Sequence, residues 1–179
     1  DFNAISGLKV DEDKGSHCLL GDRSKKPNTL LFGDSFSGHY DPFWDEILKS
    51  KGVSANAIAT NWCFPSLTDS FTGQKQNDAY KQCLLNRRYL QKNMSKYDNL
   101  ILTGAWAAIS QQGYLHEVLS LIDIAKSKGL NVIVVASPTE YDTDVTRRFK
   151  AAQFSDVFPM ELANLPKTND TLTREANAR

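Results

Sequence analysis

Four short apolar runs divide the chain, and longer stretches of mixed polarity separate them. Three of these runs are aliphatic almost throughout, whereas one, SANAIA, is weaker. Uninterrupted apolar runs of this length are typical of strands that are buried on both faces of a parallel sheet. The predicted strands are residues 29–32, 54–59, 99–103 and 131–136.

Between these runs, apolar residues recur three or four positions apart, which is the spacing of one helix face. The first helix is predicted to have Asp41 as its N-cap and Pro42 in its first turn, and to end at Gly52. Asp78 is predicted to cap the second helix, and residues 114–125 form the most regular amphipathic pattern. Strands and helices alternate in this order, so we expect an α/β domain with a parallel sheet and helices on both faces.

The two ends of the chain lack this pattern. Residues 1–27 are polar and charged, and we interpret them as a linker or lead-in to a domain over residues 28–179. Residues 143–154 and 170–179 are weaker helix candidates, and no further strand is predicted after them. Asp1 is not a natural first residue. We therefore interpret the chain as a piece of a longer protein that is truncated at its C-terminus.

Composition agrees with one domain and argues against several classes of function. Of the 179 residues, 41% are hydrophobic, which suits a single core. Basic and acidic residues balance at 21 each, so no net field favours a nucleic-acid partner. No apolar run approaches the ~20 residues that span a bilayer. No cluster of cysteine and histidine has metal-ligand spacing, and we expect neither a metal nor a cofactor.

The cysteines are Cys18, Cys63 and Cys83. The last two flank a polar loop with few apolar residues to anchor it, and a disulfide between them would fix the base of that loop. Such a bond indicates an oxidising compartment, with Cys18 unpaired or paired outside this segment. The alternative is three buried free thiols.

The turn after the first predicted strand carries the most informative residues, because ligands of open parallel sheets bind outside the carboxyl ends of the strands. Gly33 lets the chain turn where a side chain would crowd it, and Asp34 can accept backbone N–H groups and hold the turn. Ser35 then stands at the strand-to-helix junction, near N–H groups that favour a developing oxyanion. A serine so placed is a nucleophile when a general base assists it. The alternative is a turn that merely caps a helix.

The block LFGDSFS at 31–37 resembles the first motif of SGNH (GDSL-type) hydrolases, whose nucleophile is the serine of Gly-Asp-Ser. From about residue 18 to residue 141, the chain resembles more narrowly the SGNH domain fused to membrane-bound acyltransferase family 3 proteins, which O-acylate bacterial surface polysaccharides. This narrower resemblance rests on Cys18, on GDSFSGHYDPFWDEI, on Cys-Phe-Pro at 63–65 with the later Cys83, and on LTGAW at 102–106. It implies a flavodoxin-like fold.

The resemblance also implies a role for each turn at this edge of the sheet. Ser35 is expected to be the nucleophile, and its N–H and donors from the next turns are expected to form the oxyanion hole. In the third turn an indole N–H stands where general SGNH enzymes have an asparagine, and we expect the Trp106 ring to face the Ser35 pocket. The alternatives are core packing for Trp106 and a plain turn role for Asn61. The expected oxyanion and binding residues are Gly33, Asn61, Gly104 and Trp106.

Two features depart from the family pattern. Phe36 follows Gly-Asp-Ser where the family usually has histidine, and no Asp-x-x-His motif supplies a catalytic histidine. His17 lies in the polar lead-in, and His116 is predicted to be solvated on a helix. His39 is close to Ser35 in sequence and is a weaker candidate for the base. We expect the true aspartate and histidine to lie beyond residue 179.

The resemblance therefore implies an O-acyltransferase that passes an acyl group, expected to be acetyl, through Ser35 to a polysaccharide hydroxyl. The expected partners are a carbohydrate acceptor and an acyl donor from a membrane acyltransferase domain of the same chain, on the periplasmic side of the inner membrane. One alternative is a secreted carbohydrate esterase. Another is a non-catalytic carbohydrate-binding module with the same fold.

Overall fold

The computed structural model describes residues 10–11, 15–16, 18–137, 144–154, 172, 175–176 and 178. Its main feature is a five-stranded sheet in the order β3-β5-β4-β6-β7. The four predicted strands are present and run parallel to one another. The strands are β3 (Cys18–Gly21), β4 (Thr29–Gly33), β5 (Ser54–Ala59), β6 (Asn99–Thr103) and β7 (Asn131–Val134).

Strand β3 was not predicted, and it lies within the segment 1–27 that we interpreted as a lead-in. It pairs antiparallel with β5, with Leu20 opposite Ala55, and it forms one edge of the sheet. A strand of four residues within a polar segment is too short to show a periodic pattern of apolar residues. It can therefore be recognised only from its pairing with β5 in the structure. A separate two-stranded ribbon is formed by β1 (Val10–Asp11) and β2 (Gly15–Ser16).

Helices connect the parallel strands as predicted, but their starts differ from the prediction. The N-cap of α3 is Tyr40 and that of α4 is Asn77, each one residue before the expected aspartate. Two short helices follow strands. Helix α2 begins at Ser35, at the predicted strand-to-helix junction, and is separate from α3, whereas α5 was not predicted because six residues are too few to show a helical period. The helices are α2 (Ser35–His39), α3 (Asp41–Ser50), α4 (Asp78–Asn93), η1 (Met94–Lys96), α5 (Trp106–Gln111), α6 (Leu115–Ser127) and α7 (Val145–Phe154).

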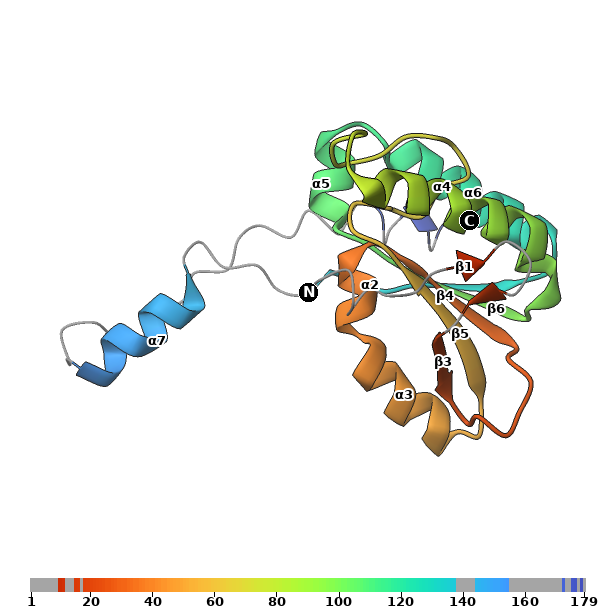
Figure 1. The fold of residues 1–179 in the computed structure, drawn as a ribbon, viewed down its shortest axis with the longest axis horizontal. Helices are drawn as coiled ribbons and strands as arrows, with labels where there is room; N and C mark the ends of the chain where they lie inside the picture. Colours follow the sequence, from red (N-terminus) through yellow and green to blue (C-terminus); the bar gives the residue numbers. More distant parts are fainter. Residues whose placement is uncertain are drawn as a thin grey trace.

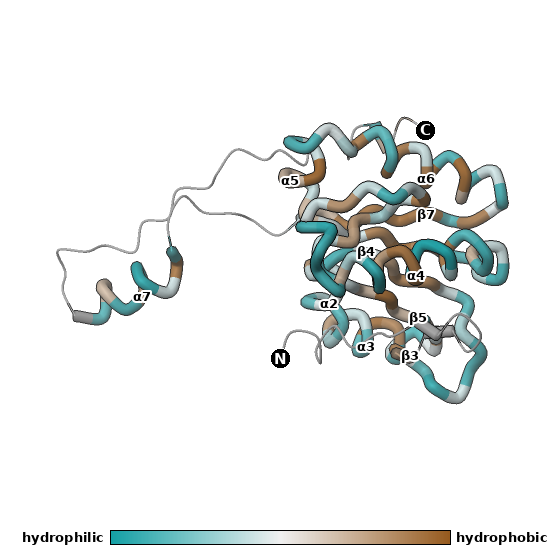
Figure 2. Tube along the Cα trace, turned by 45° about the horizontal axis from the view of Figure 1, so that its top comes forward, coloured by the Kyte–Doolittle hydropathy of each residue, from teal (hydrophilic) through white to brown (hydrophobic). Residues whose placement is uncertain are grey.

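The sheet separates two layers of helices, with α4, α5 and α6 on one face and α2 and α3 on the other (Figure 1). Alternate residues of the central strand serve the two cores. Leu30 and Phe32 pack in the larger core with α4 and α6, whereas Leu31 packs in the smaller core with Leu48 of α3. Figure 2 shows the apolar stretches gathered along the strands and the helix faces that cover them. Both faces of β4 are thus buried, which explains its uninterrupted apolar sequence.

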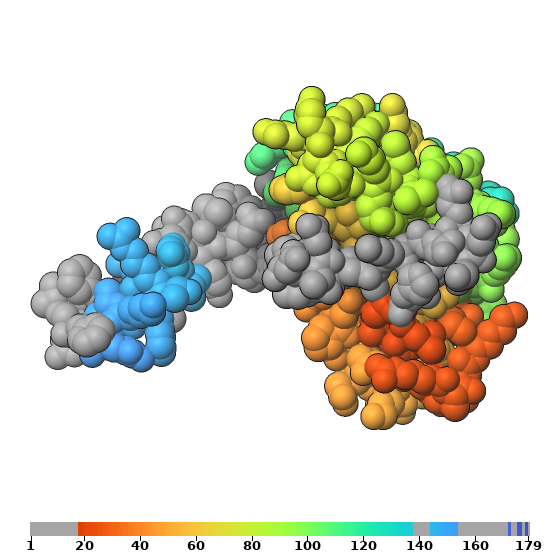
Figure 3. Space-filling view, in the orientation of Figure 1, coloured from red at the N-terminus to blue at the C-terminus, as the bar shows by residue number. Residues whose placement is uncertain are grey.

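The edge strand β7 differs from the central strands, because Asn131 and Ile133 are exposed. Beyond it, α7 stands apart from the sheet and its helices (Figures 1 and 3). Among the described residues, no helix is both long and apolar enough to cross a membrane. The predicted helix over 170–179 lies largely outside the described residues, as do Pro138 and the turn after it.

Candidate active site

The candidate site lies at the carboxyl edge of β4, the central strand. Gly33, its last residue, is in register with Ala59 of β5 and with Thr103 of β6. A Cβ atom at Gly33 would overlap the carbonyl oxygen of Thr103, so only glycine allows the strands to approach this closely. The turns that follow β4, β5 and β6 therefore begin side by side.

Asp34 supports this edge from the interior. Its carboxylate caps α2 by accepting a hydrogen bond from the N–H of Phe36 at 2.9 Å, and it also accepts one from the N–H of Ala105 at 2.8 Å. The turn-supporting hydrogen bonds predicted for Asp34 are thus present. Burial raises the pKa of Asp34, and the two N–H donors act in the opposite direction.

Ser35 is the first residue of α2 and is half-buried. Among the described residues, no group accepts a hydrogen bond from its hydroxyl or from its backbone N–H. The first N–H groups of a helix have no partner within the helix and are available to an anion. The position of Ser35 therefore leaves a hydroxyl and an N–H next to each other at the carboxyl edge of the sheet.

The turn after β5 lies beside this serine turn, because the N–H of Thr60 donates to the carbonyl of Gly33 at 3.3 Å. The next residue, Asn61, has a side-chain oxygen that is shielded from water and has no hydrogen-bond partner within the described part of the chain. A carboxamide so placed has capacity left for a ligand. The role predicted for Asn61 stays a prediction.

The expectation for Trp106 is corrected by its hydrogen bond. Its indole N–H donates to the carbonyl of Val135 at 2.7 Å, and its side chain, in the larger core, is only 1% exposed. An indole has a single N–H donor, so Trp106 has none left for an oxyanion. Gly104 explains how the ring fits, since a Cβ there would lie 2.9 Å from it. The Gly-x-Trp turn therefore serves packing, and the binding role expected of Gly104 stays a prediction.

The loop after Asn61 is fixed by covalent and polar contacts. Cys63 and Cys83 form the predicted disulfide. Arg87 of α4 is buried, and its guanidinium donates to three loop carbonyls, those of Phe64, Thr68 and Ser70.

Glu117 of α6 binds the same loop from the other side. Its carboxylate accepts hydrogen bonds from the hydroxyls of Ser66, Thr68 and Ser70. The polar residues of the loop are thus held by one buried cation and one buried carboxylate, while its Phe64 and Phe71 are buried in the larger core and anchor it there, which the sequence did not predict. Sequence reasoning also missed the buried cation and the buried carboxylate, because neither of these charged residues forms a local motif with the loop.

The histidines differ in their relation to Ser35. His39 is exposed and ends α2, one helical turn after the serine, with its ring 6.1 Å from that of Phe36. His116 is exposed, and its Nδ1 lies 2.8 Å from the carbonyl oxygen of Gly113 on the other layer of helices. His17 lies outside the described residues.

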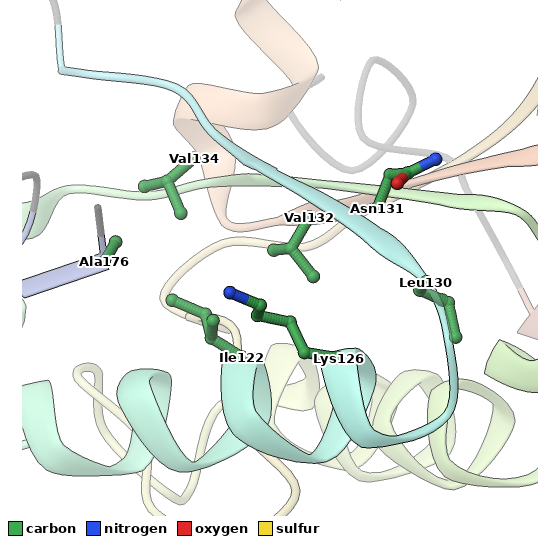
Figure 4. Close-up of a pocket in the computed structure, with 7 residues that line it drawn as sticks. All are labelled: Ile122, Lys126, Leu130, Asn131, Val132, Val134 and Ala176. Carbon is green, nitrogen blue, oxygen red and sulfur yellow. The ribbon is translucent and has the colours of Figure 1, made fainter. Parts of the chain in front are cut away.

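A surface hollow lies elsewhere, between α6 and β7 (Figure 4). Ile122 and Lys126 project from the helix toward Val132 and Val134 of the strand, and none of the lining residues belongs to the candidate site. Within the described ranges, no three histidine, cysteine or carboxylate side chains lie close enough together to hold a metal ion.

In structure, the chain is similar to the periplasmic domain of a lipopolysaccharide acetyltransferase of Salmonella ser. Paratyphi A, with a TM-score of 0.56 and 11% sequence identity. The similarity covers 96% of this chain and 63% of that domain, so this chain spans less than two thirds of its length. No curated protein matches the sequence. The family model for the SGNH domain that is fused to AT3 domains matches residues 6–179. The chain therefore belongs to the family of SGNH domains fused to AT3 acyltransferase domains.

Proposed function

We propose that this chain transfers an acyl group to a hydroxyl of a bacterial surface polysaccharide, with Ser35 as the nucleophile. The observation that carries this proposal is the position of Ser35. It begins α2 at the carboxyl edge of the central strand, with its hydroxyl and its N–H unpartnered among the described residues. Membership in the SGNH family and the similarity to a lipopolysaccharide acetyltransferase domain support the choice of reaction.

The reaction has two steps. In the first, Ser35 Oγ attacks the acyl carbonyl of the donor, its proton passes to a general base, and the donor's leaving group departs with a proton. In the second, a sugar hydroxyl attacks the acyl-serine and gives its proton to the base, and the base returns a proton to Ser35 Oγ as that oxygen leaves the acyl group. The Ser35 N–H stabilises the oxyanion in both steps, and Asn61 and the Gly104 turn border it. The family's Asp-x-x-His motif would supply a histidine as the base, and residues 1–179 contain no such motif.

The partners follow from the family. An AT3 membrane domain supplies the acyl donor, and the acceptor is a polysaccharide on the periplasmic side of the inner membrane. The disulfide Cys63–Cys83 supports an oxidising compartment. A carbohydrate esterase would share the first step and differ in the second, where water would take the place of the sugar hydroxyl.

The test uses Ser35→Ala in the cells that make the protein, with the ester content of their polysaccharide measured by NMR. A transferase predicts that the variant loses the esters, whereas an esterase predicts that they accumulate. Ser50→Ala, at the exposed end of α3, is the matched control and should change nothing. Unchanged ester content with Ser35→Ala would overturn the proposal.

A further inference from the structure

Trp62 is a large exposed aromatic residue at the candidate site. Its side chain is 42% exposed, and its backbone has φ 60°, in the left-handed region. Bulky residues rarely adopt this conformation, because the Cβ crowds the neighbouring carbonyl. Such strained residues persist only where their surroundings hold them, and they are concentrated at functional sites.

The surrounding loop holds the indole in place. Phe71 packs edge-on against it, with 6.3 Å between the ring centroids and an interplanar angle of 74°. A Cβ at Gly73 would come within 2.7 Å of the ring, so the bare backbone of this glycine lets the loop pack against the indole. The hydroxyl of Thr72 donates to the carbonyl of Trp62 at 3.0 Å, and the next residue is the disulfide-bonded Cys63. The ring is therefore positioned before any ligand arrives, which lowers the entropy cost of binding.

Trp62 and Ser35 belong to the same edge of the sheet. Ser35 lies two residues beyond Gly33, and Trp62 lies two residues beyond Thr60, whose N–H donates to the Gly33 carbonyl. The loop that carries Trp62 also reaches the end of α5, where the side chain of Gln112 donates to the carbonyl of Thr72 at 3.3 Å. It thus extends from β5 to the helix that follows β6, along the edge from which Ser35 projects.

We propose that Trp62 is a stacking platform for a sugar ring of the acceptor, a role that rests on the proposed function. A pyranose presents apolar C–H groups on its face and hydroxyls at its rim, and the negative face of an indole attracts such C–H groups. The residues around the indole suit hydroxyls, since Asn61 has an unpartnered side-chain oxygen within the described part of the chain and Gln112 is exposed. A protein partner would favour a wider apolar patch than one tryptophan among polar residues.

The experiment measures binding separately from catalysis. Polysaccharide from the cells that make the protein is freed of its esters with mild base, cut to oligosaccharides and titrated into the 179-residue chain by calorimetry. Trp62→Gly removes the ring and accepts the positive φ without strain, so it keeps the loop conformation. Trp62→Phe keeps an aromatic face. Phe43→Ala removes another exposed aromatic side chain, 54% exposed, from α3 on the opposite face of the sheet.

We expect Trp62→Gly to weaken binding about tenfold or more, Trp62→Phe to weaken it less, and Phe43→Ala to leave it unchanged. Three results would overturn the proposed platform. The first is equal affinity of Trp62→Gly and the unmodified chain, the second is an equal loss of affinity in the glycine and phenylalanine variants, and the third is no binding by the unmodified chain. Ser35→Ala separates the two proposals, because it should bind the oligosaccharide normally and transfer no acyl group. If Ser35→Ala still transferred while Trp62→Gly lost binding, the proposed reaction would fail and the sugar site would stand.

Discussion

The carboxylate of Asp34 accepts a hydrogen bond from the backbone N–H of Ala105, which lies 71 positions away in the sequence. The same carboxylate caps the helix that begins at Ser35. One buried side chain thus fixes the turn that presents the candidate nucleophile relative to the turn after β6. The site is set by this long-range contact as much as by the local Gly-Asp-Ser sequence.

Asp34→Asn should therefore weaken both the fold and the site. An asparagine has one accepting oxygen, so one of the two N–H donors loses its partner, at a cost of about 1–3 kcal/mol in the free energy of unfolding. A small displacement of Ser35 should also lower acyl transfer by about 10²-fold. Urea unfolding and the ester content of the polysaccharide measure the two effects. Asp78→Asn, at an exposed carboxylate, is the control, and equal stability of the two variants would contradict this account.

Much of the fold follows from the sequence, because burial on both faces makes a strand apolar throughout. The runs that became β4 and β6 show this directly, and the alternation with helices gave the parallel order. Strand β3 escaped prediction, since its four residues depend on pairing with β5 rather than on their own pattern. At α4 the N-cap is one residue earlier than predicted because the adjacent polar residues Asn77 and Asp78 compete for the same position, whereas the N-cap of α3 is Tyr40, which makes no side-chain cap hydrogen bond.

The site was less predictable where roles depend on contacts across the fold. The sequence placed Ser35 and Asp34 at the strand end, because Gly-Asp-Ser is a local motif. It did not predict that the carbonyl of Val135 takes the indole N–H of Trp106, since that contact joins the turns after β6 and β7. Nor could it predict the burial of Arg87, which is matched to loop carbonyls that no spacing rule links to it.

Trp106→Phe should affect stability rather than transfer. Phenylalanine fills most of the buried space but leaves the Val135 carbonyl without its donor, which costs about 1–3 kcal/mol in the free energy of unfolding. Trp44→Phe is a matched control, because the shielded indole N–H of Trp44 has no partner within the described ranges and its loss should cost less. Thermal unfolding compares the two variants. If Trp106→Phe left stability unchanged and strongly reduced acyl transfer, the indole of Trp106 would have a role in the catalytic site after all.

Glu117→Gln should loosen the loop that carries Trp62. Burial disfavours the ionised carboxylate, but the hydroxyls of Ser70, Thr68 and Ser66 and the charge of Arg87 outweigh it and lower the pKa of Glu117. A carboxylate with a lowered pKa stabilises the fold above its ordinary pKa, and that contribution is lost as the pH falls through the lowered value. The glutamine variant should lose about 1–3 kcal/mol at pH 7 and less at pH 3.

Unfolding in urea at both pH values measures this difference for Glu117→Gln. Glu46→Gln, on the exposed side of α3, controls for the loss of one negative charge. A loss of stability that is the same at both pH values would show that the ionised form of Glu117 is not what holds the loop.

Asp41→Asn should have the opposite effect on stability. Burial raises the pKa of Asp41 to about 6, and one of its carboxylate oxygens is shielded without a partner among the described residues. The folded state therefore favours the protonated, neutral form of Asp41. The contribution of this form to the free energy of unfolding is complete below about pH 4 and is lost as the pH rises through about 6. The variant should be more stable than the unmodified chain by about 1–3 kcal/mol at pH 7 and equal to it at pH 4. Urea unfolding of both proteins between pH 4 and pH 7 measures this difference in stability. A difference that does not change with pH would contradict the raised pKa of Asp41.

Ser35 should react slowly with a serine-directed phosphonate in the 179-residue chain. Phosphonylation needs an activated hydroxyl, and no described group accepts a hydrogen bond from the Ser35 hydroxyl. Intact-mass spectrometry follows the labelling, and Ser35→Ala shows which part of it is specific. Rapid labelling that disappears in Ser35→Ala would mean that a base lies within residues 1–179. His39, one helical turn after Ser35, would then be tested by His39→Ala, because loss of rapid labelling in that variant would identify its imidazole as the base.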